Sequence, residues 1–135
     1  MKINNFWIIF IAGILVLIGS CATDDDSSSS STSIPAAPTE GSATAGWHQV
    51  VLDWDAVSGA TSYTIYWDTS SGVSTSSTAI TGITDDNYTH TGLDNGTTYY
   101  YKGVSVNSAG TSALSGELSA TPRTGPTVTE ACTYG

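Results

Sequence analysis

The sequence predicts an all-β protein in which seven short antiparallel strands form a sandwich. Two observations predict this fold. From Pro35 onward, short alternating runs of aromatic and β-branched residues are separated at fairly even intervals by Gly, Asp, Asn and Ser, and no stretch has a convincing helical period. The chain of 135 residues also has room for one ordinary domain with appendages, but not for a second substantial core.

Residues 1–20 have the pattern of a secretory signal peptide. Lys2 supplies the positive flank, and the run from Phe6 to Ile18 is almost wholly apolar. As a helix, this run would be roughly 20 Å long, which is short for a bilayer core of about 30 Å. No basic stop-transfer segment follows it. We therefore expect export followed by cleavage.

Cys21 stands at the end of this leader, directly after the small residues Gly19 and Ser20. The sequence "IGSC" resembles the lipobox of bacterial lipoproteins. In that family, the thiol at the position of Cys21 is alkylated by a diacylglycerol, the chain is cut before it, and the new amine is acylated. Several acyl chains hold a domain on a membrane, since each buried CH₂ contributes about 0.8 kcal/mol. The alternatives are an uncleaved helix or an ordinary signal peptide with an incidental cysteine.

Residues 21–36 predict a disordered tether, because aspartates 24–26 and the serines after them combine low hydrophobicity with like charge. An acidic run behind the lipidated cysteine also resembles the surface-export signal of some Gram-negative lipoproteins. This resemblance implies a lipid-anchored protein of the bacterial outer membrane that faces the cell surface. A plain solvated spacer would have a similar composition.

The strands follow from alternation along the chain. Val50, Leu52 and Trp54 share one face of a run that is typical of a half-buried strand, and residues 63–67 repeat this pattern. The other predicted strands lie near Ala43 and over residues 78–83, 88–91, 98–106 and 114–121, with turns over residues 57–60 and 93–97.

Residues 37–123 resemble a bacterial fibronectin type III domain, an immunoglobulin-like sandwich. The resemblance is carried by Trp54 on the second strand, by Leu93 six positions before Tyr99, by the bend at 106–110 and by the closing "ATP". It implies structural roles for Trp54, Leu93 and Tyr99. The spacing also has a mechanical interpretation, since a tyrosine just after this corner can bury its ring and bond its hydroxyl to upstream backbone.

Three departures from the family pattern carry expectations of their own. Gly41 stands on the first strand, where the family often has a large aliphatic residue. The sheet edge that this strand forms is therefore expected to be loosely held. Gly103 falls where valine is usual and Ser105 replaces a small apolar residue, which predicts either a bulge or unfilled packing space, and modest stability. His90 lies on the face of Tyr88 and is expected to be a half-buried histidine bonded to backbone; the alternative is a ligand or pH-sensing group.

The sequence offers no catalytic motif, so we predict a protein that is not an enzyme and that needs no cofactor or metal. A G-x-S-x-G element is absent, and His48 and His90 sit on separate elements. Zinc-binding spacings are absent as well. Twelve acidic residues against three basic ones give a formal net charge of −9, which repels phosphate backbones and argues against a nucleic-acid partner.

Function must then rest on exposed groups, because a sandwich is a scaffold that does not fix its function. Trp47 in the first turn, with Tyr66 and Tyr100 on the parity opposite their core-facing neighbours, are the candidate ligand contacts. Such rings stack on sugars or grip a protein partner. The structural alternative is that Tyr66 and Tyr100 form cross-strand pairs and that Trp47 covers an end of the core.

The expected function is therefore a membrane-anchored, non-catalytic binding or adhesion module with a protein or glycan ligand. The alternative is a spacer or accessory fragment of a larger secreted carbohydrate-active or surface-layer protein. Residues 124–135 are expected to be an unstructured tail. Within this tail, Cys132 lacks a partner once Cys21 carries lipid, which leaves a free thiol or a disulfide-linked dimer.

The lipidation prediction has a direct test. Cells that express the wild-type chain should incorporate labelled palmitate into the protein, whereas the Cys21→Ala variant should incorporate none, because the thiol that receives the diacylglycerol is gone. Equal incorporation into the two proteins would remove Cys21 as the anchor.

Overall fold

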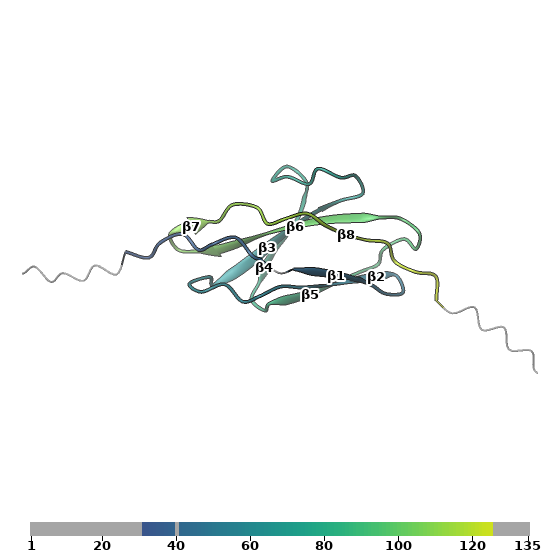
Figure 1. Cartoon of the computed structure of the whole chain (residues 1–135), viewed down its shortest axis with the longest axis horizontal. Helices are drawn as coiled ribbons and strands as arrows, with labels where there is room; N and C mark the ends of the chain where they lie inside the picture. The colour runs from purple at the N-terminus through teal and green to yellow at the C-terminus, as the bar shows by residue number, and fades with distance from the viewer. Residues whose placement is uncertain (1–30, 40, 126–135) are drawn as a thin grey trace, which may run out of the picture. The chain divides into compact units, whose positions relative to one another are not determined.

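The computed structural model describes residues 31–39 and 41–125 (Figure 1). The predicted signal peptide, Cys21, most of the predicted tether and Cys132 lie outside this part of the chain. None of the described residues lies in a helix long and apolar enough to span a membrane. The described part contains eight strands: β1 Ser42–Ala45, β2 Gln49–Asp53, β3 Ser62–Asp68, β4 Thr78–Ile83, β5 Asn87–Thr91, β6 Tyr99–Asn107, β7 Gly110–Thr111 and β8 Leu118–Ala120.

The strands form two antiparallel sheets that pack face to face as a sandwich, which confirms the predicted fold class (Figure 1). One sheet has the order β1-β2-β5. The other has the order β4-β3-β6-β7, with β8 also paired to β6. Every strand pair is antiparallel, so each sheet can bury one face and leave the other to solvent.

The core lies between the sheets. From β2 and the residue after it, Val50, Leu52 and Trp54 point inward, and each is at most 6% exposed. They meet aromatic side chains from β3 and β6, among them Tyr63, whose ring centroid lies 5.3 Å from that of Trp54 in an edge-to-face arrangement. Burial of each large apolar side chain contributes about 1.5–3 kcal/mol, so this layer supplies most of the driving force that holds the sheets together.

The contacts of the domain begin before residue 37, where the sequence placed the boundary. Pro35 is buried, and the Asn107 side-chain amide donates a hydrogen bond of 2.8 Å to the Ser33 carbonyl. The Ile34 side chain lies against Gly110, at 3.2 Å from the position that a Cβ would take there. Residues 33–35, which the composition assigned to the tether, therefore pack on the β6–β7 end of the sandwich.

Of the predicted seventh strand, residues 114–121, only residues 118–120 form a strand, β8, and the short strand β7 (residues 110–111) comes before the predicted range. β7 and β8 both pair with β6, and residues 112–117 between them leave the ladder. Two serine hydroxyls replace the missing backbone acceptors there: Ser112 Oγ accepts from the Ser105 N–H at 2.9 Å, and Ser115 Oγ accepts from the Gly103 N–H at 2.8 Å. The backbone N–H groups of the same serines also donate to the Ser105 and Gly103 carbonyls, at 2.9 and 2.8 Å, so this segment stays bound to β6 without forming a regular strand.

The bulge considered at Gly103 is absent. The register between β3 and β6 runs without interruption from the Ser62–Val106 pair to the Asp68–Tyr100 pair. Gly103 therefore keeps its inward position, where Ile65 Cδ1 and the Pro38 ring lie 3.3 and 3.6 Å from the place that a Cβ would take, and it borders a cavity between the sheets. The nearby Ser105 is fully buried, and its hydroxyl has no partner among the described residues.

His90 is half-buried, but its partner is a side chain rather than backbone. Its Nδ1 lies 3.2 Å from the Tyr101 hydroxyl oxygen, and its ring centroid lies 4.9 Å from that of Trp67. Val50 on β2 stands directly opposite His90, which directs the imidazole into the aromatic end of the core. Burial lowers the pKa of His90 from its usual 6.5, because desolvation penalises the charged ring.

Tyr99 closes the corner that precedes β6. Its side chain is 5% exposed, and its hydroxyl accepts a hydrogen bond of 3.1 Å from the Asp94 backbone N–H. Leu93, which is 4% exposed, fills the core beneath the same turn. This is the geometry that the spacing of Leu93 and Tyr99 predicts, and it joins the crossover between the two sheets to the start of β6.

The Tyr99→Phe variant should keep the ring and lose the bond to the Asp94 N–H. We expect the free energy of unfolding to fall by about 1 kcal/mol, which urea denaturation measures. Tyr100→Phe is the matched control, since the Tyr100 hydroxyl makes no hydrogen bond within the described residues, and it should change stability by less than about 0.5 kcal/mol. Equal losses in both variants would contradict a special role for the Tyr99 hydroxyl.

Candidate binding surface

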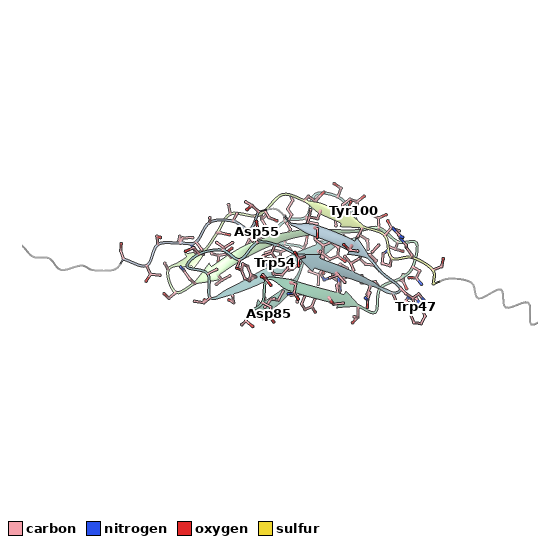
Figure 2. The ribbon with its side chains drawn as sticks, turned by 60° about the horizontal axis from the view of Figure 1, so that its bottom comes forward. Trp47, Trp54, Asp55, Asp85 and Tyr100 are labelled. Carbon is pink, nitrogen blue, oxygen red and sulfur yellow. The ribbon has the colours of Figure 1, made fainter. Side chains whose placement is uncertain are left out.

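Trp47 is the most exposed large apolar side chain of the described residues. It lies in the turn between β1 and β2 and is 68% exposed, whereas Ile34, the other exposed large hydrophobic residue in the described part, is 54% exposed (Figure 2). Three segments meet around it: residues 46–48, residues 93–96 and residues 122–125. We call these segments together the Trp47 tip.

His48 holds the first two segments together. Its φ of 54° is the only left-handed backbone conformation of a non-glycine residue in the described part. Three bonds hold it there. The His48 N–H donates to Asn95 Oδ1 at 2.9 Å, His48 Nδ1 lies 2.7 Å from the Leu93 carbonyl oxygen, and His48 Nε2 lies 3.0 Å from Asn95 Nδ2.

These partners also assign the proton on the His48 ring. A carbonyl oxygen only accepts, so Nδ1 must carry the hydrogen that it donates to Leu93. Nε2 is then free to accept from the Asn95 amide, and the neutral imidazole satisfies both bonds. The same turn gains a backbone bond of 3.0 Å, which the Leu93 N–H donates to the His48 carbonyl.

The third segment supports the indole of Trp47. The Arg123 N–H donates to the Gly46 carbonyl at 2.9 Å, and Trp47 and Arg123 form a parallel β-bridge. Gly125 passes so close to the ring that a Cβ there would lie 3.4 Å from Trp47 Cδ1. The His48 ring packs edge-on against Trp47, with centroids 5.1 Å apart. An exposed aromatic that is held in this way loses little conformational freedom when it binds.

Tyr66 and Tyr100 lie elsewhere, on the outer face of the sheet formed by β3 and β6. Both are half-buried. Lys102 stands opposite Tyr66 and Asp68 stands opposite Tyr100, so the two tyrosines are diagonal neighbours rather than a direct cross-strand pair. Tyr100 and Trp47 lie apart on the domain (Figure 2). The structure thus does not gather the three candidate rings into one surface.

The sequence analysis did not predict the hydrogen bonds that converge on the Glu117 carboxylate beside this face. We call Glu117 and its partners the Glu117 clasp. Glu117 accepts hydrogen bonds from the Ser71 hydroxyl at 2.7 Å and from the N–H groups of Gly72 and Val73 at 2.9 and 2.8 Å. Lys102 Nζ approaches the same carboxylate at 3.8 Å. No short-range pattern could have indicated these contacts, because the bonded residues are 44 to 46 positions apart.

The clasp carries a pH dependence whose sign follows from its bonds. The hydrogen bonds from Ser71, Val73 and Gly72, with a smaller contribution from Lys102, hold the pKa of Glu117 below its usual 4.5. A lowered folded-state pKa means that the contribution of the clasp is complete above pH 4.5. It is lost as the pH falls through the folded-state pKa.

The acidic side chains do not converge. Asp55 and Asp85 are exposed and lie on different turns (Figure 2). Within residues 31–39 and 41–125, no group of three or more His, Cys, Asp or Glu side chains is placed to hold a metal ion. These acids therefore contribute charge to the surface rather than a built site.

Comparison with known proteins relates the described domain to solved structures. No protein-family model matches the chain, and no curated protein matches it. A Fn3-like protein from Clostridium thermocellum is similar, with 36% sequence identity, a TM-score of 0.58, and coverage of 68% of this chain and 97% of that chain. FN3tt has 25% identity and a TM-score of 0.59, and the match covers 69% of this chain and 99% of FN3tt.

A third solved structure is similar in fold alone. The FN1–FN3 domains of chicken CNTN1 have 18% identity and a TM-score of 0.56, and the match covers 64% of this chain and 32% of that one. The Clostridium thermocellum protein and FN3tt, by contrast, consist almost entirely of the matched region. Within this chain, residues 32–39 and 41–125 belong to one compact unit.

The Asn95→Ala variant tests the tip. It removes both bonds between Asn95 and His48 and leaves the left-handed His48 backbone with less support, so the free energy of unfolding should fall by about 1–3 kcal/mol in urea denaturation. Asn87→Ala is the control, because the Asn87 side-chain amide donates only to the exposed Asp86. A loss no larger than that of Asn87→Ala would mean that Asn95 does not hold the tip.

Proposed function

We propose that this chain, which belongs to the fibronectin type III family, is a non-catalytic binding module held on a bacterial membrane by lipid on Cys21. The fold alone does not supply this function, since sandwiches of this kind are scaffolds for many roles. One observation carries the proposal: a tryptophan that is 68% exposed stands on a turn that side-chain bonds, a backbone bridge and a neighbouring ring all hold in place.

The chemistry of the Trp47 tip suits an uncharged or basic partner. Tryptophan is enriched among the residues that dominate binding energy, and its flat apolar face stacks on sugar rings or fills a pocket on a protein. The formal net charge of −9 disfavours polyanionic partners. The partner class is therefore a glycan or an uncharged to basic protein surface.

The positions of Ser33 and Trp47 at opposite ends of the sandwich support a role for the Trp47 tip in contacting partners away from the membrane. Ser33 is bonded to Asn107 at the β7 end of the sandwich, and Trp47 lies with Arg123 at the opposite end (Figures 1 and 2). A lipid anchor upstream of Ser33 would then leave the Trp47 tip as the end directed away from the membrane. Twelve residues from Cys21 to Ser33 would reach roughly 20 Å on average as a flexible coil.

A spacer role is the second candidate, and one observation favours it. The first and last described residues lie at opposite ends of the sandwich, which is the arrangement that a module in a linear series needs (Figure 1). In a longer protein, the Trp47 tip would then contact the following module instead of a foreign ligand. The two functions differ in whether the isolated domain binds anything.

The test is to screen residues 32–135, under reducing conditions, on glycan arrays and matrix-protein arrays. We expect a saturable hit that Trp47→Ala abolishes while the melting temperature stays within a few degrees, because the exposed indole contributes little to the core. Ile34→Ala is the matched control, as it truncates the other exposed hydrophobic side chain at the far end of the domain.

Each outcome decides between the candidates. A hit that survives Trp47→Ala but is lost in Tyr66→Ala or Tyr100→Ala would move the site to the outer face of β3 and β6. No saturable hit on either array would remove the binding function and leave the spacer role.

A further inference from the structure

His48 brings an ionisable ring into the hydrogen bonds of the Trp47 tip. The ring bonds the corner that contains Leu93 and Asn95, and the His48 backbone beside it is left-handed. Histidine is the side chain whose ordinary titration lies between pH 5 and pH 8. A hydrogen bond that requires one charge state of this ring therefore responds to modest changes in pH.

The Asn95 amide satisfies both of its bonds to His48 in only one orientation. The His48 backbone N–H is a donor at every pH, and it lies 2.9 Å from Asn95 Oδ1, so the amide oxygen is held at this position. The amide nitrogen then faces the ring, 3.0 Å from His48 Nε2. Because this nitrogen only donates, Nε2 must accept and must carry no hydrogen.

Protonation of the ring conflicts with this arrangement. The protonated ring keeps the bond from Nδ1 to the Leu93 carbonyl oxygen, at 2.7 Å, but its Nε2 becomes a donor that faces the NH₂ group of Asn95. Rotation of the Asn95 amide would offer its oxygen to Nε2, but the same rotation would turn the NH₂ group toward the His48 backbone N–H. In either orientation, one of the two bonds between His48 and Asn95 is lost.

The charged neighbours of His48 do not compensate for this loss. Within the described segments of the tip, they are Asp94 on the corner and Arg123 on the C-terminal segment. Asp94 makes no ion pair with the His48 ring. Arg123 has the same charge as a protonated imidazole and so does not stabilise one. The other histidine, His90, belongs to a separate network, since its ring bonds Tyr101.

We propose that His48 is a pH switch of the Trp47 tip: the neutral ring holds the turn in the observed geometry, and the protonated ring releases one bond to Asn95. The turn that loosens is the one that carries Trp47, whose ring packs edge-on against His48. A less ordered turn raises the cost of fixing the indole in a complex. The switch itself needs no ligand; only its effect on binding rests on the proposed function.

The test compares Asn95→Asp with the wild type by urea denaturation of residues 32–135, under reducing conditions, at pH 8 and at pH 5. The variant keeps one oxygen for the His48 backbone N–H and turns a second oxygen toward Nε2, so it favours the protonated ring. From pH 8 to pH 5, the unfolding equilibrium constant of the variant should fall about tenfold relative to that of the wild type, because the variant gains a charged bond where the wild type loses a bond. Protonation of His90 is common to both proteins and cancels in this ratio.

The matched control repeats this comparison in a His48→Asn background. Asparagine tolerates the left-handed backbone but has no ring to protonate, so Asn95→Asp should there lose its response to pH. A second measurement is independent of these variants: the ¹⁵N shifts of the imidazole nitrogens of the wild type at pH 8 should show hydrogen on Nδ1 of His48.

Three results would overturn the proposal. They are a ratio of unfolding constants that is the same at pH 8 and pH 5, an equal pH response in the His48→Asn background, and a neutral His48 ring with its hydrogen on Nε2. None of these measurements uses a ligand, so a failed array screen would count against the proposed function and not against the switch.

Discussion

Burial of one face of each sheet is the constraint on which the rest of this structure depends. Val50, Leu52 and Trp54 come from one sheet, Tyr63 and Tyr101 from the other, and none of the five is more than 6% exposed. Each such side chain contributes about 1.5–3 kcal/mol when it leaves water. A slip of one residue in any strand would reverse its faces, so this layer also decides which side chains point outward.

The rigidity of the Trp47 tip is a consequence of the same core. Leu93 is buried beneath the corner, and its backbone N–H and carbonyl both bond to His48. His48 in turn shares two bonds with Asn95. The turn that presents Trp47 is therefore tied to a residue that cannot move without opening the core, which is how an exposed side chain gains a defined position.

In contrast to the Trp47 tip, the edge where β1 and β8 approach each other has an interrupted strand. The Ser112 and Ser115 hydroxyls accept hydrogen bonds from β6 where the regular pairing between β7 and β8 is interrupted. Gly41 and Gly103 border a cavity beside this interruption. Small residues weaken strand pairing and packing together. The molecule thus combines one end that is held by many bonds with one edge where regular strand pairing is interrupted.

The sequence by itself determined the sandwich, the inward parity of β2 and β3, and the corner at Tyr99, because each depends on a period of two or on spacings of a few residues. Only the tertiary structure decided that His48 meets Asn95, 47 positions away, that His90 bonds Tyr101, and that Gly41 and Gly103 border the same cavity. Those contacts depend on the register between strands and on how one sheet lies over the other. Local alternation carries no information about either.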